Sequence, residues 1–553
     1  MQSPHDERGG ASLEGTAVDR PGAGSRRQSS AIGSWAVHPF FLATYPILAL
    51  FAQNAHKVRL PDLARITIVA LVGTAAIWLV LTLLLKDRRK AGLITSTAVV
   101  LFFAYGLTRE AVNNTLSRLS VYWVRSDIRV PPAVVLVPEV VLLAGLASLI
   151  VLKLKDAGRP TAFLNVFTTI LIVIPVAQAI RVKSATLGRP PHRPTPFKLT
   201  ATSERSAAPD IYYIILDGYA RTDVMRSLFD FDNAPFLDRL ERRGFYIARR
   251  STANHCQTVL CLSASLNAVY LDDLVKGLGP DQTELTDLIG RNNVVASLKP
   301  LGYKVVSFAT GFDPTEHPEE DVYLSPYPHP SGFERIVIDI TPLRVIWPDP
   351  RQFDPITQSR ARTLYVLDHL ADIAKDPAPT FTLAHLLCPH PPFVFGETGE
   401  DVGARYLNFM NADGDRNRGR FRDPAQYCKA YRGQAAFITQ RIEQTINRIL
   451  AESPKPPIII LQSDHGSELN LDMSDVHHTD LKERMSILNA YYFPGRRHEA
   501  LYDRISPVNS FRVVLNTFFA ANLELLPDRS FYSTWTDPYH FIDVTDDVRS
   551  PAD

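Results

Sequence analysis

The sequence predicts a multi-pass transmembrane helical domain followed by an α/β domain whose mostly parallel sheet is covered by helices on both faces. Three observations lead to this fold class. Apolar segments of roughly the 20 residues that cross a bilayer are confined to the first third of the chain. Beyond residue 210, short apolar runs alternate with segments of helical periodicity. With 553 residues, the chain is also too long for one ordinary domain.

Residues 1–33 are rich in Gly, Ser and Arg and contain few apolar side chains. Such a segment cannot bury enough apolar surface to offset the loss of chain entropy, so we predict a disordered tail. The tail lacks the apolar core and small-residue cleavage pattern of a secretory signal. The first apolar segment is therefore expected to stay in the membrane.

Five apolar segments follow and define a predicted transmembrane domain over residues 34–183. They cover residues 37–52, 66–85, 91–107, 133–152 and 162–180. Pro39 and Pro46 weaken the first segment as a spanning helix. Five crossings are predicted, with four or six as the alternatives.

Basic residues gather in two short loops between these segments. One loop, residues 86–90, reads Lys-Asp-Arg-Arg-Lys, and the other contains Lys153, Lys155 and Arg159. Short basic loops stay in the cytoplasm, so five crossings leave the C-terminal domain on the opposite side. We therefore expect a multi-pass protein of the inner or plasma membrane with an extracytoplasmic C-terminal domain.

Residues 184–209 repeat Pro, Arg and Thr, which predicts an extended linker. The α/β domain is predicted over residues 210–545. Its expected strands are residues 211–216, 304–309, 380–386, 457–461 and 486–493, and its expected helices include residues 234–243, 363–375 and 434–450. Strands that alternate with helices form parallel sheets with helices on both faces.

Charge and cysteine content exclude some classes of function. The net charge of +1 gives no reason to expect a nucleic-acid partner. Four cysteines in a chain of this length, with no C-x-x-C pair, do not make a disulfide framework. Cys256 and Cys261 are expected to be small buried side chains, with a disulfide or ligand role as the alternative.

Two predicted strand ends carry residue types that bind metal ions. Asp217 follows the strand at 211–216, and Asp464 and His465 follow the strand at 457–461. Ligands of open α/β sheets gather just beyond the carboxyl ends of the strands. Asp and His supply oxygen and nitrogen ligands, and Gly466 allows the backbone to turn sharply. The sequence therefore predicts a metal site at this edge.

Thr258 is the candidate nucleophile. It precedes an apolar, helix-like run at residues 259–270 and occupies the expected helix N-cap, where free amides stabilise an attacked phosphoryl or sulfuryl oxygen. A threonine hydroxyl is a poor nucleophile at neutral pH. Coordination to a divalent cation held by Asp217, Asp464 and His465 would activate it. A plain N-cap threonine is the alternative interpretation.

Further polar residues flank these motifs. His477 and His478 lie shortly after the Asp-His-Gly turn and offer a second metal ligand or a general acid, with a pair of surface histidines as the alternative. Asn254 offers a hydrogen-bonding group to the site. His385 lies inside a predicted strand and is expected to be a packed core histidine.

The order of these motifs resembles that of a known group. Residues 216–218 (Leu-Asp-Gly), Thr258 at a helix start, residues 384–392 with His390 between prolines, and residues 463–466 (Ser-Asp-His-Gly) resemble the sulfatase-type branch of the alkaline phosphatase superfamily. The resemblance is to membrane-embedded members such as lipoteichoic acid synthases and phosphoethanolamine transferases. The resemblance implies that Thr258 is nucleophile and metal ligand, that Asp217, Asp464 and His465 complete the metal site, and that His390 contacts the substrate or leaving group.

Two departures from the family pattern narrow the expected chemistry. Lipoteichoic acid synthases usually carry Glu where this chain has Asp217, so Mn²⁺, Zn²⁺, Mg²⁺ and Ca²⁺ are not distinguished. True sulfatases need a C/S-x-P-x-R signature for conversion to formylglycine, and residues 256–260 and 261–265 both lack its Pro and Arg. This disfavours sulfate-ester hydrolysis and favours a covalent phospho-threonine intermediate.

We predict a membrane-anchored, metal-dependent phosphotransferase that moves a phospho-headgroup from a lipid or lipid-linked donor to an envelope acceptor. The first alternative is a phosphodiesterase, phosphatase or sulfuric-ester hydrolase that uses the same site with water as acceptor. The second is a non-catalytic envelope binding protein, against which the intact set of site residues argues. The sequence predicts no oligomeric state.

Overall fold

The computed structural model describes residues 35–549 apart from gaps at 55–57, 59, 124–131, 189–191, 201–207, 277, 279–281, 328–329, 347–353 and 404–423. The tail predicted over residues 1–33 lies outside the described residues, and so do residues 189–191 and 201–207 of the predicted linker.

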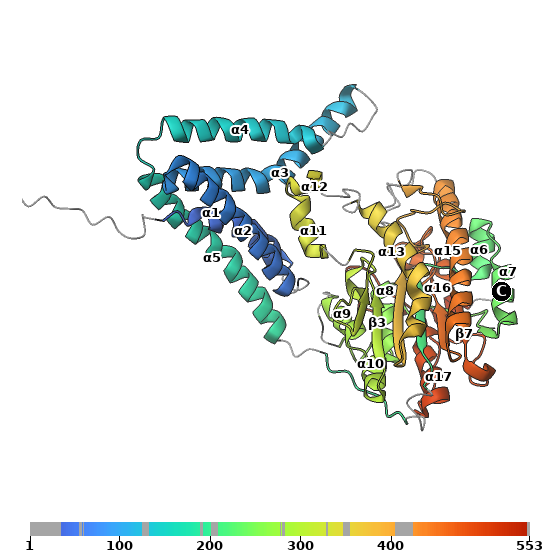
Figure 1. The fold of residues 1–553 in the computed structure, drawn as a ribbon. Coiled ribbons are helices and arrows are strands. Elements are labelled where there is room, and N and C mark those ends of the chain that lie inside the picture. The colour runs from blue at the N-terminus through green and yellow to red at the C-terminus, as the bar shows by residue number, and fades with distance from the viewer. Residues whose placement is uncertain are drawn as a thin grey trace, which may run out of the picture.

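All five apolar segments of the N-terminal region form helices (Figure 1). They are α1 (His38–Gln53), α2 (Leu60–Leu85), α3 (Arg88–Trp123), α4 (Pro132–Leu152) and α5 (Gly158–Gly188). In the described part of the chain, four helices, α2 to α5, are long and apolar enough to cross a membrane. Helix α1 has 16 residues. At 1.5 Å per residue it is about 24 Å long, against roughly 30 Å for a hydrocarbon core.

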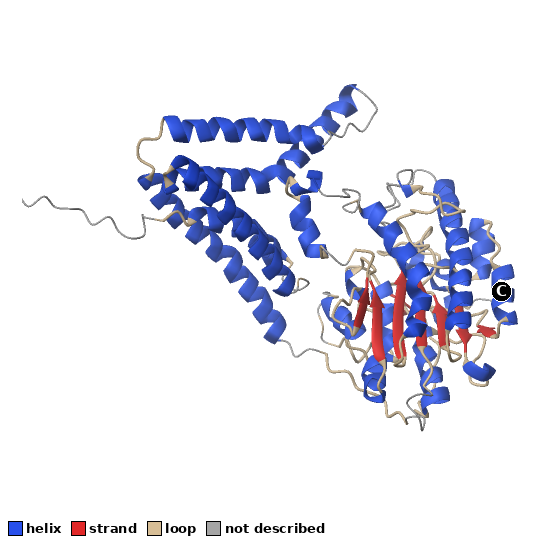
Figure 2. Ribbon diagram, viewed as in Figure 1, coloured by secondary structure: helices blue, strands red, loops and turns tan. Residues whose placement is uncertain are grey.

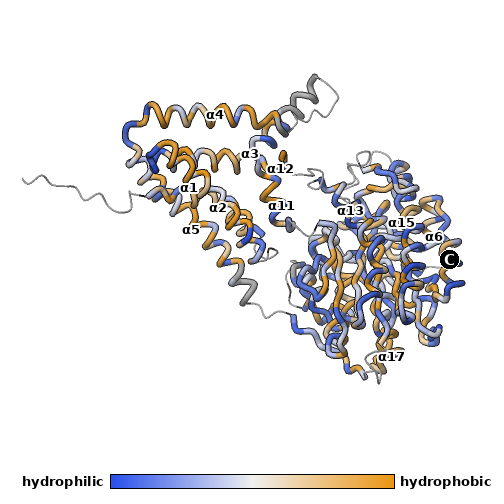
Figure 3. The backbone as a smooth tube through the Cα atoms, in the orientation of Figure 1, coloured by the Kyte–Doolittle hydropathy of each residue, from blue (hydrophilic) through white to orange (hydrophobic). Residues whose placement is uncertain are grey.

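Helices α2, α4 and α5 consist largely of hydrophobic residues, which are orange in Figure 3. Leu83, Val141 and Phe163 are each about two-thirds exposed on these helices. Such a surface is unfavourable in water and is satisfied by lipid chains. Helix α1 instead packs against α2, α3 and α5. The chain is therefore a membrane protein, as its sequence predicts.

The C-terminal domain is built on a seven-stranded sheet with the order β2-β7-β6-β1-β5-β3-β4. Its strands are β1 (Ile211–Leu216), β2 (Phe245–Ile247), β3 (Lys304–Phe308), β4 (Val322–Leu324), β5 (Thr380–Leu386), β6 (Ile458–Gln462) and β7 (Asn489–Tyr492). Only β7 runs antiparallel to its neighbours, so the sheet is mostly parallel, as predicted. The two unpredicted strands, β2 and β4, have three residues each, too few for a periodic pattern to stand out.

Helices cover both faces of this sheet, which is red in Figure 2. Tyr212, Ile214 and Leu216 of β1 point to one face, while Ile211, Tyr213 and Ile215 point to the other. The first face packs against α6 (Thr222–Phe229), α7 (Ala234–Arg242), α13 (Pro355–His369) and α15 (Pro424–Glu452). The second packs against α8 (Thr258–Asn267), α9 (Thr283–Gly290), α10 (Asn293–Leu298) and α17 (Pro507–Phe519). The predicted α/β fold class is confirmed.

Shorter elements complete the domain. They are α11 (Gly332–Asp339), α12 (Leu343–Ile346), α16 (Leu481–Met485), α18 (Thr545–Val548), β8 (Phe531–Tyr532) and β9 (Ile542–Asp543). Helix α13 starts before the predicted span of 363–375, and residues 370–375 form a 3₁₀ helix instead. Helix α15 extends beyond the predicted 434–450 at both ends.

Helix α11 forms the contact between the membrane helices and the C-terminal domain. It follows β4 and lies between the membrane helices and the sheet (Figure 1). The Phe333 ring meets the Phe51 ring of α1 edge to face, with centroids 6.4 Å apart. The buried Glu334 carboxylate accepts hydrogen bonds of 2.5 and 2.9 Å from the Arg65 guanidinium of α2. An aromatic contact and a paired charge therefore hold α11 on the membrane domain.

This contact predicts the effect of truncating Phe333. Phe333→Ala removes a buried ring, a change that commonly costs about 3–5 kcal/mol, so α11 should detach more often. Hydrogen exchange of residues 332–339 in the full-length protein in detergent should become faster. Ile336→Ala is the control, because Ile336 is 49% exposed on the same helix. Equal exchange in the two variants would contradict the proposed docking.

Candidate metal centre

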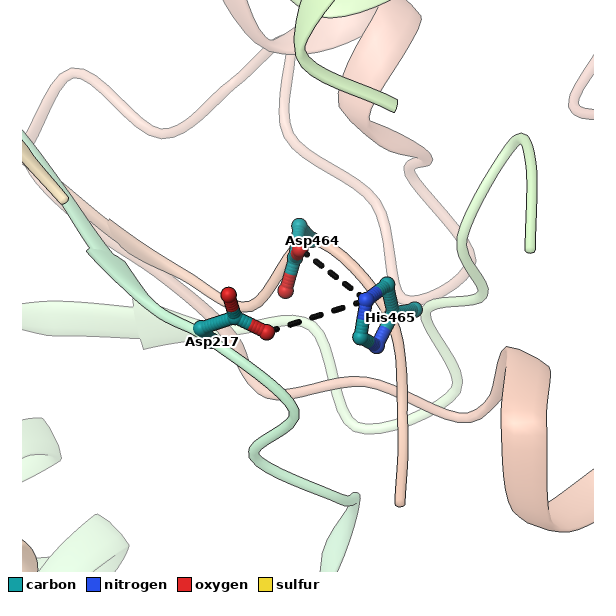
Figure 4. Close-up of side chains that lie close together, drawn as sticks. All are labelled: Asp217, Asp464 and His465. Atoms are coloured by element: carbon teal, nitrogen blue, oxygen red, sulfur yellow. Dashed lines mark ion pairs between the residues drawn. The ribbon is translucent and has the colours of Figure 1, made fainter. Parts of the chain in front are cut away.

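Three potential ligands meet at the carboxyl ends of two neighbouring strands. Asp217 directly follows β1, and Asp464 and His465 follow β6, which pairs with β1 in parallel. Parallel strands bring their carboxyl ends to the same edge of the sheet. One ligand atom from each residue lies within 4.8 Å of the others, and all three residues are buried (Figure 4).

His465 Nε2 is the centre of this cluster. It lies 3.2 Å from Asp464 Oδ2, 3.7 Å from Asp217 Oδ1 and 2.9 Å from the Thr258 hydroxyl oxygen. The other ring nitrogen, Nδ1, donates to the Gly466 carbonyl oxygen at 3.0 Å. This hydrogen bond assigns the proton to Nδ1 and leaves the Nε2 lone pair directed at the two carboxylates and the hydroxyl.

The donor set fits a divalent cation. Asp217 Oδ1 and Asp464 Oδ2 are buried and make no hydrogen bond, although such atoms normally have a partner. Burial and the nearby Arg484 lower the pKa of His465 to about 4, so the imidazole is neutral at pH 7. Two carboxylate oxygens and a neutral imidazole nitrogen, beside a hydroxyl, are ligand types of a tetrahedral transition-metal site.

His385 supports Asp217 from the adjacent strand β5. Its Nε2 lies 3.2 Å from Asp217 Oδ2, and its Nδ1 lies 2.9 Å from the Thr315 hydroxyl. Burial raises the pKa of Asp217, but the nearby His390 and the His385 contact outweigh this and hold it well below the usual range. His385 is buried in its strand as predicted, yet it is more than a packing residue. A polar side chain inside a fully buried strand needs a hydrogen-bond partner, and this requirement is the sequence signal that indicates a role for His385 beyond packing.

Thr258 is the first residue of α8. The N-cap is Gln257, so the N-cap position predicted for Thr258 is wrong by one residue. The backbone amides of this first turn have no partner within the helix, and the positive end of its dipole adds to their effect. Thr258 is half-buried, in contrast to the fully buried Asp217 and His465. Thr258 is therefore more exposed than either of these residues.

His390 borders the metal centre on a second side. Its backbone N–H donates to the Asp217 carbonyl oxygen at 3.0 Å. The ring centre lies 6.2 Å from that of His465, its Nδ1 donates to the Pro391 carbonyl oxygen at 2.6 Å, and its Nε2 lies 3.5 Å from the buried Glu468 carboxylate. The sequence motifs indicated His390 but gave no reason to single out Glu468.

Arg484 links the segment just before Thr258 to the Asp-His-Gly turn at residues 464–466. Its buried guanidinium donates to the carbonyl oxygens of Cys256, at 2.7 and 2.9 Å, and Gly466, at 3.2 Å. Cys256 and Cys261 are buried and form no disulfide, which agrees with their predicted packing role. Arg484 was not predicted, because its partners are backbone atoms that a sequence pattern does not reveal.

Three predicted residues lie outside the cluster. His477 and His478 are exposed in a 3₁₀ helix, and His478 Nδ1 lies 3.1 Å from the Asp475 carboxylate. Asn254 is buried but holds the C-terminal segment: its amide donates to the Arg529 carbonyl oxygen, and its carbonyl oxygen accepts from the Val508 N–H. The structure therefore brings together Thr258, Asp217, Asp464, His465 and His390, without these three.

His255 makes the site region sensitive to acid. It is fully buried three residues before Thr258, packs against Phe531 and Phe541, and neither ring nitrogen makes a hydrogen bond. Burial lowers its pKa from 6.5 to about 3. The unfolded chain therefore binds a proton that the folded chain excludes, and stability should fall as the pH drops from 6.5 toward 3, by up to about 1.4 kcal/mol per pH unit.

His255→Phe should remove this acid sensitivity, because a phenyl ring fits an aromatic pocket and does not titrate. We expect thermal midpoints of the full-length protein in detergent to decline less between pH 7 and pH 4 in this variant than in the wild type. The control is His478→Gln, which changes an exposed histidine. Parallel pH profiles for His255→Phe and the wild type would show that His255 does not titrate as described.

Comparisons with known proteins identify a family for this chain. The sulfatase family model matches residues 209–508, more than half of the chain. No curated protein sequence matches. Among solved structures, the zinc complex of the periplasmic domain of EcEptC from Escherichia coli is similar at 12% identity and a TM-score of 0.41, covering 64% of this chain and 96% of that one.

The integral membrane protein lipooligosaccharide phosphoethanolamine transferase A from Neisseria meningitidis is similar at 12% identity and a TM-score of 0.40, covering 88% of this chain and 95% of that one. The family match spans every residue of the metal cluster, from Asp217 to His465. It confirms the resemblance drawn from the motifs. The chain belongs to the sulfatase family, within the alkaline phosphatase superfamily.

Proposed function

We propose that this membrane protein is a metal-dependent phosphotransferase that moves a phospho-headgroup from a lipid donor to an envelope acceptor through phospho-Thr258. The contact that carries the proposal is the 2.9 Å between the Thr258 hydroxyl oxygen and His465 Nε2, inside a set of metal-ligand residues. The chain also lacks the Pro and Arg of the formylglycine signature around Thr258. A hydroxyl nucleophile of this kind suits a phosphoester better than a sulfate ester.

Asp217, Asp464, His465 and Thr258 would hold the divalent cation. When bound, the cation would lower the pKa of the threonine hydroxyl and neutralise charge on the phosphoryl oxygens. Imidazole nitrogen among the ligands favours a transition ion such as Zn²⁺ over Ca²⁺. The amides of the first turn of α8, which begins at Thr258, have no partner within the helix and would bind a phosphoryl oxygen.

The bonds and protons of the proposed transfer are accounted for by the donor, Thr258 and the acceptor alone. Thr258 Oγ1 attacks phosphorus, the bond between phosphorus and the donor's alcohol oxygen breaks, and the threonine proton ends on the departing alcohol. His390, beside Glu468, is the group we assign to carrying that proton. The acceptor's hydroxyl then attacks the phospho-threonine, and Thr258 recovers a proton as the new phosphodiester forms.

The membrane helices support an extracytoplasmic position for this site. The basic loops after α2 and α4 lie at one end of the helix bundle, since Lys90 Nζ donates to the Val151 carbonyl oxygen. If that end is cytoplasmic, α5 carries the chain to the other side. The C-terminal domain is on that side whether or not α1 crosses the membrane. Trp35, which precedes α1, lies beneath Arg88 at the basic end of the bundle. Phe51, near the end of α1, contacts Phe333 of α11 at the opposite end of the bundle. These two contacts support a crossing by α1 and hence five crossings in total.

The nucleophile is tested by mass. Full-length wild-type protein in detergent, incubated with mixed phospholipids and Zn²⁺ or Mn²⁺, should acquire a phospho-headgroup on the Thr258 peptide. Thr258→Ala should lose the adduct and at least about a thousandfold in turnover, as nucleophile removal commonly does. Thr258→Ser keeps a hydroxyl and should retain some adduct. An adduct of equal yield in Thr258→Ala would eliminate this threonine as the nucleophile.

The role of His385 is tested by metal affinity. His385→Ala leaves Asp217 without its hydrogen-bond donor, and loss of such a partner commonly weakens metal binding by about 10- to 100-fold. Competition with a fluorescent zinc chelator measures the change. His385→Gln keeps a donor near Asp217 and should recover part of the affinity. His369→Ala removes a surface histidine bound to Asp372 and serves as the control. Wild-type affinity in His385→Ala would remove His385 from the site.

Hydrolysis is the second candidate, because water can replace the acceptor alcohol at the same residues. Thr258 is half-buried, which supports access of water to this residue. Steady release of free headgroup phosphate without any added alcohol would favour the hydrolase. A stable adduct that is discharged only by an alcohol would favour the transferase.

A further inference from the structure

A large basic cleft lies beside the metal centre but contains none of its ligands. It has a volume of about 570 Å³ and is lined by side chains of α6, the end of β2 and the segment around β7. Its charged lining residues are Arg221, Arg226, Arg249, Arg250, Lys482 and Asp223, five cations and one anion. Small-molecule sites commonly occupy about 300–1,000 Å³, so the cleft is large enough for a ligand of several functional groups.

The cleft opens at the same edge of the sheet as the metal centre. Strands β2 and β6 both run antiparallel to β7, so their carboxyl ends point the same way. Arg249 and Arg250 follow the end of β2, just as Asp464 follows the end of β6. Arg221 lies four residues after Asp217, and its backbone N–H donates to the Ser486 carbonyl oxygen.

The residues that line the cleft include more cations than acids. Asp223 pairs with Arg221 at 2.8 Å and with Lys482 at 3.6 Å. None of the ion pairs found among the described residues involves Arg250, which is exposed. Arg226 and Arg249 pair with acids that do not line the cleft.

A further arginine, Arg504, lies near Arg221 and Arg250 of the cleft and near Asp503. Burial, together with the positive charges of Arg250, Arg549 and Arg221, lowers the pKa of Arg504. A planar guanidinium matches phosphate or carboxylate oxygens in pairs, so neighbouring arginines suit a bound anion.

The sheet order separates this cleft from the membrane. Strand β2 lies at one end of the sheet and β4 at the other, with β6 and β1, which carry the metal ligands, near the middle. Helix α11, which contacts the membrane helices, follows β4 (Figure 1). A lipid donor would therefore approach from the β4 side, which leaves the cleft on the β2 side for the other substrate.

We propose that the basic cleft binds a phosphate- or carboxylate-bearing part of a water-soluble or extended acceptor, next to the metal centre and on its side away from the membrane. This assignment rests on the transferase proposal for the metal site. The binding itself requires only the cations of the cleft, so it can be measured without turnover.

The test titrates full-length protein in detergent with inorganic pyrophosphate, with and without EDTA. Pyrophosphate can also contact a bound metal ion, and EDTA removes that contribution. We expect binding that resists EDTA, weakens with salt, and weakens at least about tenfold in Arg250→Ala and in Lys482→Ala, the loss of one charged hydrogen-bonding group. Arg432→Ala is the control, since Arg432 is an exposed arginine of α15 that pairs with Asp230.

Thermal midpoints that match the wild type establish that the variants are folded. Absence of EDTA-resistant binding, or equal weakening in Arg432→Ala, would overturn the proposal. A second titration with phosphatidic acid in mixed micelles separates the two sources of phosphate. Binding of the lipid but not of pyrophosphate would assign the cleft to a membrane substrate and overturn the acceptor assignment. Failure of the Thr258 adduct experiment leaves this measurement unchanged, so the two proposals fail separately.

Discussion

Two carboxylates held close together in a buried site are the constraint on which the catalytic domain depends. Asp217 and Asp464 follow adjacent parallel strands and lie within 4.8 Å of a shared imidazole and of each other. At that separation two negative charges repel by about 3.5 kcal/mol for an effective dielectric constant of 20. The surroundings offset this repulsion with the Gly218 N–H on Asp464 and with His385 on Asp217, and two oxygens remain free for a cation. The hydroxyl of Thr258, the proposed nucleophile, lies against the same imidazole.

The sheet that creates this site also orders the groups around it. Its middle strands end at the candidate metal ligands, its β4 end leads to α11 and the membrane, and its β2 end leads to the basic cleft. A reaction between a lipid and a polar partner needs access from two directions. An open sheet supplies this without a change of fold, because every loop beyond the carboxyl ends of its strands faces the same edge.

The contact between α11 and the membrane helices gives the catalytic domain a defined position relative to the lipid. Glu334 is buried, and removing a buried carboxylate from water is costly unless a cation with good geometry accompanies it. Arg65 supplies that cation from α2, and Phe333 and Phe51 exclude water beside the pair. The Gly106 N–H adds a hydrogen bond from α3 to the Ile340 carbonyl oxygen at the other end of α11. The interface therefore combines apolar packing with polar contacts that depend on orientation.

The sequence by itself determined the membrane domain, the α/β class and the position of the candidate metal ligands Asp217, Asp464 and His465 at strand ends. These follow from local patterns: apolar length, the alternation of strands with helices, and polar residues directly after buried strands. The tertiary structure alone decided that His385 supports Asp217, that Asn254 holds the C-terminal segment, and that five separate cations line one cleft. The physical reason is that these roles arise from contacts between residues far apart in the chain. Such contacts depend on strand order and register, and a periodic pattern in one segment carries no information about either.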